Sequence, residues 1–167
     1  MKEISHVVYQ TCETLDFPVP YIFMEPGRSI VGEAGITLYR VGGIKEIPNI
    51  RTYVSVDGGM TDNPRYALYQ SEYSVVVANK ANEPAVKKVT IAGRCCESGD
   101  LIQENTMIQD VEVGDTLAVL STGAYNYSMA SNYNRLPRPP IVMLRGGNES
   151  YVAVRRESLE DLCRNDL

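Results

Sequence analysis

The chain has 167 residues, a formal net charge of −5 at pH 7 and 44% hydrophobic residues, which indicates about one domain with enough apolar side chains for a core. Without a basic surplus it does not resemble a nucleic-acid-binding protein. No apolar run approaches the roughly 18 residues of a membrane span. No signal-type apolar segment follows the charged start Met1-Lys2-Glu3. We therefore expect a cytoplasmic protein that contacts neither nucleic acid nor membrane.

The cysteines argue against a metal site or a disulfide framework. There are four, and the only histidine is His6. Cys95 and Cys96 are adjacent, which disfavours a bond between them, and no CxxC spacing occurs. We expect reduced thiols and no bound metal. The remaining cysteines are Cys12 and Cys163.

The first 35 residues predict a helix, a strand and a second helix. Residues 2–15 place apolar side chains at helical spacing, Tyr21–Met24 is a short apolar run typical of a buried strand, and Arg28–Ala34 precedes Gly35. This order resembles the closing unit of an α/β barrel, which needs about 250 residues. We expect residues 1–35 to be a remnant of such a barrel, and the chain to be the C-terminal portion of a longer protein.

Residues 36–167 predict a mainly β domain. Short β-branched or alternating runs are separated by Gly, Pro, Asn and Asp, as in an antiparallel Greek-key-like β-barrel or sandwich. The predicted strands are Ile36–Ile47, Arg51–Val56, Tyr73–Ala78, Lys87–Ala92, Thr116–Ser121, Ile141–Leu144 and Tyr151–Arg155. The last two flank Gly146-Gly147-Asn148 and predict a hairpin. A capping box at Ser158–Asp161 predicts a final flanking helix.

The pentapeptide Cys96–Asp100 places a thiol beside a carboxylate in a Gly-bearing turn after a strand. A thiol is mostly protonated at neutral pH and can give a proton, and the Glu97 carboxylate can hold a cationic group. The alternative is that a free cysteine is a small buried apolar residue, which we expect for Cys95. Asp100 is expected to cap backbone groups of the turn.

Two arginines are candidates for binding anions. In Glu25-Pro26-Gly27-Arg28, the glycine permits close backbone approach, the following helix start offers N–H groups, and Arg28 can grip a phosphate or carboxylate. Arg65 and Tyr69 are four residues apart and would share one face of a helical turn. The alternatives are a Pro-Gly turn with a solvated arginine, and an exposed arginine beside a half-buried tyrosine.

These motifs occur in a characteristic order. They are Glu25–Arg28, Asp62–Tyr69, Cys96–Asp100, and Gly123-Ala124-Tyr125 with the polar loop Asn126–Asn134. Together they resemble the C-terminal part of the diaminopimelate decarboxylases, lyases of the alanine-racemase-like fold type III, from about Tyr21 to Val154. The resemblance implies pyridoxal 5'-phosphate as cofactor, conversion of meso-2,6-diaminopimelate to L-lysine and CO2 in lysine biosynthesis, and a homodimer with shared active sites.

The resemblance also implies residue roles. Cys96 would donate a proton to the substrate carbanion, and Glu97 would bind the distal amino group. The implied substrate-binding residues are Arg28, Arg65, Tyr69, Glu97 and Tyr125, and the implied cofactor-binding residues are Glu25, Pro26, Gly27, Arg28 and Tyr125.

The family's Schiff-base lysine belongs to its α/β barrel. Among the five lysines here, Lys80 lies in a segment that resembles the lysine motif, but it follows a predicted strand in the wrong half of the chain, and Pro84 marks a turn. We therefore expect this chain alone to be inactive. Two alternatives remain open: an ornithine, arginine or carboxynorspermidine decarboxylase of the same fold, or a non-catalytic β-domain for dimerisation or binding.

Overall fold

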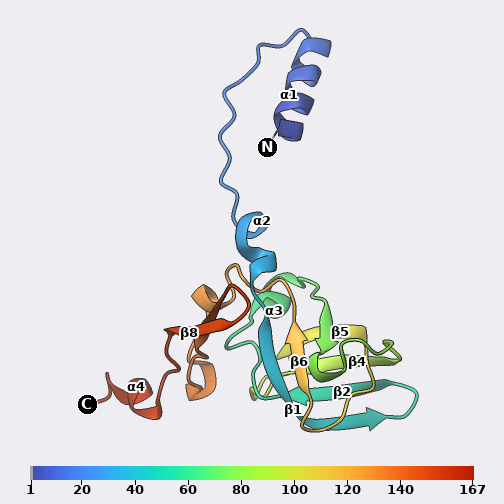
Figure 1. Cartoon of the computed structure of the whole chain (residues 1–167), viewed down its shortest axis with the longest axis vertical. Coiled ribbons are helices and arrows are strands. Elements are labelled where there is room, and N and C mark those ends of the chain that lie inside the picture. The colour runs from blue at the N-terminus through green and yellow to red at the C-terminus, as the bar shows by residue number, and fades with distance from the viewer. Residues whose placement is uncertain (1) are drawn as a thin grey trace.

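The computed structural model describes residues 2–167 and shows a β-domain from which one helix stands apart on an extended stalk (Figure 1). Helix α1 (Lys2–Thr14) forms as predicted, but only its Cys12 is buried. The stalk, residues 17–27, leads to α2 (Arg28–Val31) and a 3-10 turn (Gly32–Ala34). The predicted strand Tyr21–Met24 is wrong: this segment has no regular structure, because none of the described strands lies beside it to complete its backbone hydrogen bonds.

Six strands form the main sheet in the order β3-β6-β1-β2-β4-β5. Their bounds are β1 (Thr37–Ile47), β2 (Arg51–Val56), β3 (Val75–Val77), β4 (Lys87–Ala92), β5 (Leu101–Ile108) and β6 (Thr116–Val119). The mainly β fold class is confirmed. All pairings in this sheet are antiparallel except β2 with β4, which is parallel. The sequence did not predict β5, because the polar run Gln103-Glu104-Asn105 interrupts its apolar pattern.

The sheet curves until its two edge strands, β3 and β5, face one another. Side chains rather than a backbone ladder bridge this seam: Gln103 Oε1 accepts from the backbone N–H of Tyr73 at 2.8 Å, and Gln109 Oε1 accepts from that of Val77 at 2.8 Å. The enclosed core is aliphatic and includes the fully buried Ile91, Ile102, Ile108 and Leu117. The nearly closed barrel thus fixes the ends of its strands, where the connecting loops carry the predicted site residues.

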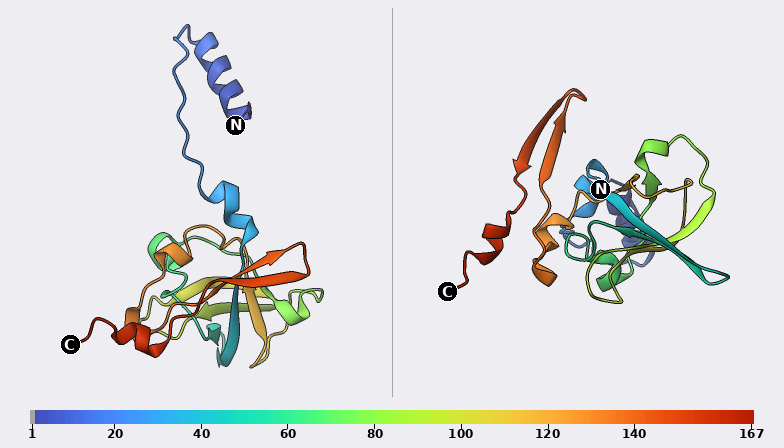
Figure 2. Two further views of the ribbon diagram at one scale, coloured as in Figure 1. Left: turned by 60° about the vertical axis from the view of Figure 1, so that its left-hand side comes forward. Right: turned by 90° about the horizontal axis from the view of Figure 1, so that it is seen from below.

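The C-terminal part lies outside this barrel. Strands β7 (Ile141–Arg145) and β8 (Glu149–Val154) form a separate antiparallel hairpin, as predicted, that stands away from the sheet (Figure 2). Gly146 and Gly147 turn the chain with positive φ angles of 58° and 80°, which favour glycine. Helix α4 (Leu159–Cys163) follows, and the predicted capping box is present between Ser158 and Asp161.

No helix within residues 2–167 combines the length and apolar character that crossing a membrane requires.

Candidate active site

Two glycines dock the loop after β6 onto the segment after α2. Gly35 O accepts from the Thr122 N–H, and Gly32 O accepts from the Gly123 N–H, both at 2.9 Å. A Cβ on Gly35 would lie 2.4 Å from Gly123 Cα, so these backbones can approach only without side chains. The contact carries Tyr125, two residues further on, to the end of the stalk.

Tyr125 closes over Gly27. A Cβ built on Gly27 would lie 1.6 Å from the Tyr125 hydroxyl, so the phenol occupies space that only a glycine leaves open. Tyr125 also has a φ of 71°, a left-handed conformation that is rare for a bulky residue and is concentrated at functional sites. The predicted pair Gly27 and Tyr125 is therefore brought together by the fold.

Arg28 lies beside this pair and is held by Tyr73. Its guanidinium lies 5.6 Å from the centre of the Tyr73 ring, Nη2 donates to the Tyr73 hydroxyl at 3.3 Å, and Nη1 donates to Ser121 O at 3.3 Å. The Arg28 Nε is buried and has no hydrogen-bond partner among the described residues. Because α2 has only four residues, the candidate anion-binding group here is the Arg28 guanidinium rather than the predicted helix N-terminus.

Helix α3 (Arg65–Tyr69) brings the second arginine to the same place. Arg65 lies 5.2 Å from the Tyr69 ring centre, as their spacing predicts, and 5.5 Å from that of Tyr125. Its buried Nε likewise lacks a partner within residues 2–167. Two guanidinium groups and two phenols therefore lie near Gly27 and the end of α3. We call Gly27, Arg28, Arg65, Tyr69 and Tyr125 the anion cluster.

The other residues of two predicted motifs have different surroundings. Glu25 and Pro26 are exposed at the end of the stalk. Asp62 is buried, accepts from the Gly59 N–H at 3.0 Å and pairs with the Tyr39 hydroxyl. Burial raises the pKa of Asp62, and burial together with the nearby Asp62 raises that of Tyr39. Asp62 therefore shapes the loop before α3.

The thiol–carboxylate turn between β4 and β5 is anchored by Asp100. This buried carboxylate accepts from the backbone N–H groups of Met60 at 2.6 Å and Cys95 at 2.7 Å. Cys96 and Glu97 are exposed at the tip, where the Cys96 N–H donates to Asn134 Oδ1 at 2.8 Å. The predicted capping role of Asp100 agrees with these contacts, and the turn leaves both predicted site residues exposed.

The adjacent thiols differ in their surroundings. Burial, followed by the nearby Asp100 carboxylate, raises the pKa of Cys95 to about 11. This thiol therefore stays protonated and unreactive at neutral pH. Cys96 faces solvent and is accessible to a substrate.

The anion cluster and the thiol–carboxylate turn share no direct polar contact among the described residues. The loop Asn126–Asn134 connects them in sequence: it leaves Tyr125 and ends at Asn134, which bonds Cys96. Within residues 2–167, no hydrogen bond, ion pair or ring contact joins Cys96 or Glu97 to the anion cluster. One copy of the chain therefore carries both groups of predicted site residues without a direct polar contact between them.

The lysine considered from sequence has a structural role. Lys80 Nζ bonds Asp115 at 2.9 Å, Glu112 at 3.1 Å and the backbone oxygen of Asp110 at 2.9 Å. Hydrogen bonds to Asp115 and Glu112 raise its pKa. None of the described lysines contacts the anion cluster. The part of the chain that the structure describes also contains no cluster of three or more metal-binding side chains.

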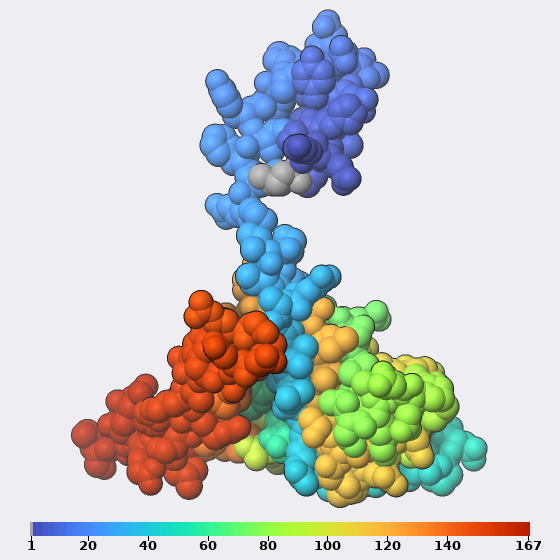
Figure 3. Space-filling model, in the orientation of Figure 1, coloured from blue at the N-terminus to red at the C-terminus, as the bar shows by residue number. Residues whose placement is uncertain are grey.

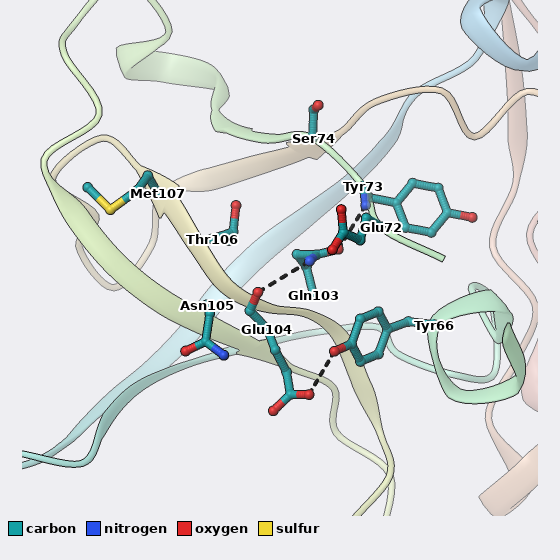
Figure 4. Close-up of a pocket in the computed structure, with 9 residues that line it drawn as sticks. All are labelled: Tyr66, Glu72, Tyr73, Ser74, Gln103, Glu104, Asn105, Thr106 and Met107. Atoms are coloured by element: carbon teal, nitrogen blue, oxygen red, sulfur yellow. Dashed lines mark hydrogen bonds between the residues drawn. The ribbon is translucent and has the colours of Figure 1, made fainter. Parts of the chain in front are cut away.

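Sequence reasoning missed the residues that support the arginines. Tyr73 holds Arg28, whereas Tyr66, on α3, donates from its hydroxyl to Glu104 Oε2 at 2.7 Å. Together with Glu72 and Gln103, these residues line an open polar pocket of ≈ 710 Å³ between α3, β3 and β5 (Figure 4). The sequence shows that Tyr66 follows Arg65, but it does not indicate that Tyr66 pairs with Glu104, 38 residues further along the chain.

Comparison with known proteins identifies the family of this domain. Residues 21–123, more than half of the chain, match the family described as pyridoxal-dependent decarboxylase, C-terminal sheet domain. The chain belongs to this family. Family membership accounts for the mainly β domain.

Individual relatives are similar along the whole chain. A diaminopimelate decarboxylase from Bacillus subtilis is 50% identical over 167 residues, and one from Synechocystis is 50% identical over 159 residues. The chain spans 38% and 34% of their respective lengths. A crystal structure of diaminopimelate decarboxylase from M. jannaschii in complex with L-lysine matches with a TM-score of 0.82 and 36% identity, covering 96% of this chain and 36% of that one.

Proposed function

We propose that this chain is the C-terminal sheet domain of a diaminopimelate decarboxylase, a lyase that converts meso-2,6-diaminopimelate to L-lysine and CO2. The observation that carries the proposal is the 50% identity to diaminopimelate decarboxylases along all 167 residues. A lysine/ornithine decarboxylase structure at 23% identity shares the fold alone and favours no other substrate.

The anion cluster fits a cofactor phosphate and a substrate carboxylate. Gly27 leaves room for the Tyr125 phenol, and the buried Nε atoms of Arg28 and Arg65 have no partner within the described chain. A phosphate and a carboxylate are the anions that guanidinium groups grip best. Pyridoxal phosphate supplies an electron sink when it is bound. Glu25 and Pro26 would contribute contacts from the end of the stalk.

The remaining residues orient the substrate and supply a proton. Arg65 and Tyr69 would bind one terminal carboxylate, and Glu97 would bind the distal ammonium group by charge. The Cys96 Sγ would hold the proton that replaces the departing CO2 on the same carbon, as a general acid. Because Cys96 is exposed and makes no direct polar contact with the anion cluster, it would complete the site of a second subunit in a homodimer.

This role suits a cytoplasmic enzyme of amino-acid biosynthesis. All four cysteines are free, and reduced thiols persist in that compartment.

The first test is turnover by the full-length protein on a panel of amino acids. We expect lysine and CO2 from meso-diaminopimelate, and at least about a hundredfold lower kcat/KM for ornithine and arginine, which lack the distal carboxylate. Faster turnover of ornithine would contradict the assignment. The 167-residue chain alone serves as the control: it should release no CO2, because a pyridoxal phosphate enzyme needs a lysine for the cofactor and none of the described lysines contacts the anion cluster.

A further inference from the structure

Helix α3 carries Arg65 and Tyr69 but cannot fix its own position. It has five residues, no side-chain cap at Pro64, and a left-handed Gln70 at its end. Helices this short are unstable without tertiary contacts, because fixing the backbone of the first turn costs more free energy than its hydrogen bonds gain. The direction in which Arg65 points must therefore be set by whatever holds the helix to the sheet.

A tether of three residues makes that connection. The Tyr66 hydroxyl donates to Glu104 Oε2 at 2.7 Å, and Arg51 Nη1 pairs with Glu104 Oε1 at 2.5 Å. Each oxygen of the Glu104 carboxylate has one of these partners. Tyr66, Glu104 and Arg51 come from α3, β5 and β2, so the tether joins the helix to two strands. Figure 4 shows the Tyr66 hydroxyl pointing at the Glu104 carboxylate.

The tether keeps its protonation state at neutral pH. The Tyr66 hydroxyl and the Arg51 guanidinium lower the pKa of Glu104, which therefore remains a carboxylate. Burial, and then the hydrogen bond to Glu104, raises the pKa of Tyr66 to about 12, so its hydroxyl remains a donor. The hydrogen bond is thus charge-assisted, which makes it stronger than a neutral one.

Tyr66 and Arg65 are neighbours on one turn and point in different directions. Successive residues on an α-helix are rotated by about 100°, so anchoring one of them fixes the rotation of the other. With Tyr66 held on β5, Arg65 faces the Tyr125 ring at 5.5 Å and Tyr69 at 5.2 Å. A freely rotating helix would move the Arg65 guanidinium away from the Tyr125 ring.

We propose that Tyr66 and Glu104 are positioning residues that hold α3 in the rotation at which Arg65 and Tyr69 can bind the substrate carboxylate. This inference rests on the proposed function. A loss of the tether would weaken binding equally in the ground state and the transition state, because Arg65 grips a carboxylate that remains intact throughout the reaction. The signature of such a loss is a raised KM with an unchanged kcat.

Tyr66→Phe in the full-length protein removes only the hydroxyl and keeps the ring. We expect KM for diaminopimelate to rise about three- to tenfold, the effect of one hydrogen bond, with kcat within about twofold of the unaltered protein. Glu104→Gln should raise KM by a similar factor. In the Tyr66→Phe/Glu104→Gln double variant, the free-energy change that corresponds to the rise in KM should not exceed the sum of the two single-variant changes. Asp110→Asn is the matched control, since it removes an exposed ion pair with Lys87 just beyond β5 and should leave KM unchanged.

Hydrogen exchange on the same proteins provides a readout that does not need turnover. The N–H groups of Leu68 and Gln70 bond Pro64 O and Tyr66 O within α3, and they should exchange faster in Tyr66→Phe while β1 and β2 amides do not change. An unchanged KM, or a fall in kcat alone, would overturn the positioning role. Should the unaltered protein fail to decarboxylate diaminopimelate, the proposed function fails, and unchanged α3 exchange would then separately refute the tether.

Discussion

Gly27 is the residue at which the anion cluster is most sensitive to one added atom. In Gly27→Ala the new Cβ would lie 1.6 Å from the Tyr125 hydroxyl and 2.8 Å from Cζ, so the phenol must swing away. Because the obstacle is the far end of a side chain, the fold should survive. We expect the full-length variant to bind pyridoxal phosphate about tenfold more weakly, the cost of roughly one good hydrogen bond.

A spectroscopic titration of the cofactor measures this change. Gly43→Ala is the matched control, because a Cβ there meets nothing within 4 Å. Equal affinity of the two variants would show that Tyr125 does not contact the phosphate.

The sequence predicted the residues of the anion cluster but not the side chains that hold its two arginines in place. The spacing of Arg65 and Tyr69 predicted one shared face, and the structure confirms that geometry. The roles of Tyr73 and Glu104 could not be predicted, because each acts through a contact between residues far apart in the chain, at separations of 45 and 38. Such contacts depend on strand order, which local patterns do not determine.

The connection between β3 and β6 depends on a carboxylate with a lowered pKa. Asp115 accepts from Asn79 Nδ2 and the Glu112 N–H, both at 2.8 Å, and pairs with Lys80. The Asn79 hydrogen bond, the Glu112 N–H and the Lys80 charge lower its pKa to about 2. An unfolded aspartate titrates near pH 4, so the unfolded chain binds more protons between about pH 4 and 2, and Asp115 loses its stabilising contribution as the pH falls through this window.

Thermal unfolding of the chain between pH 6 and pH 2 tests this contribution. Asp115→Asn should have a lower Tm than the unaltered chain at pH 6, and the difference should shrink as the pH falls to 2. Asp110→Asn, which removes an exposed carboxylate, should show a small difference throughout. A Tm difference for Asp115→Asn that stays constant with pH would contradict the account.

Elements with a strong local pattern were predicted and those that depend on neighbours were not. Strand β4 has the predicted bounds, and the hairpin of β7 and β8 forms around its glycines. Strand β5 was not predicted because its polar side chains interrupt the apolar pattern. Gln103 accepts a hydrogen bond from the Tyr73 N–H across the seam, and Glu104 accepts one from Tyr66 in the tether. Tyr21–Met24 has strand composition but no partner strand, so composition alone gave the wrong answer.

Across the whole molecule, apolar side chains remain exposed on α1 and its stalk, which project from the β-domain (Figure 3). Tyr21 is 94% exposed and Phe23 is 90% exposed. Surfaces of this kind are normally covered by a partner surface. Since the chain spans 38% of its Bacillus subtilis relative, we expect the rest of a full-length enzyme to cover them. The division into a barrel remnant, residues 1–35, and a β-domain, residues 36–167, remains a prediction.

We predict that the anion cluster of one subunit works with the Cys96–Glu97 turn of another subunit in a decarboxylase. Both halves lie in this chain, so each can be disabled separately. Cys96→Ala should lower kcat of the full-length protein about a hundredfold or more, the usual contribution of a general acid. Arg28→Ala should disable the anion cluster. In a mixed dimer of these two variants, one site would have both halves intact and the other would have neither.

Mixing the two variants and measuring CO2 release from diaminopimelate is the most direct test. After subunit exchange in an equimolar mixture, half of the dimers are mixed and each has one working site, so activity should recover to about one quarter of that of the unaltered enzyme. Mixing either variant with the Cys96→Ala/Arg28→Ala double variant should restore nothing and serves as the control. A mixture of the single variants no more active than the variants alone would contradict the account.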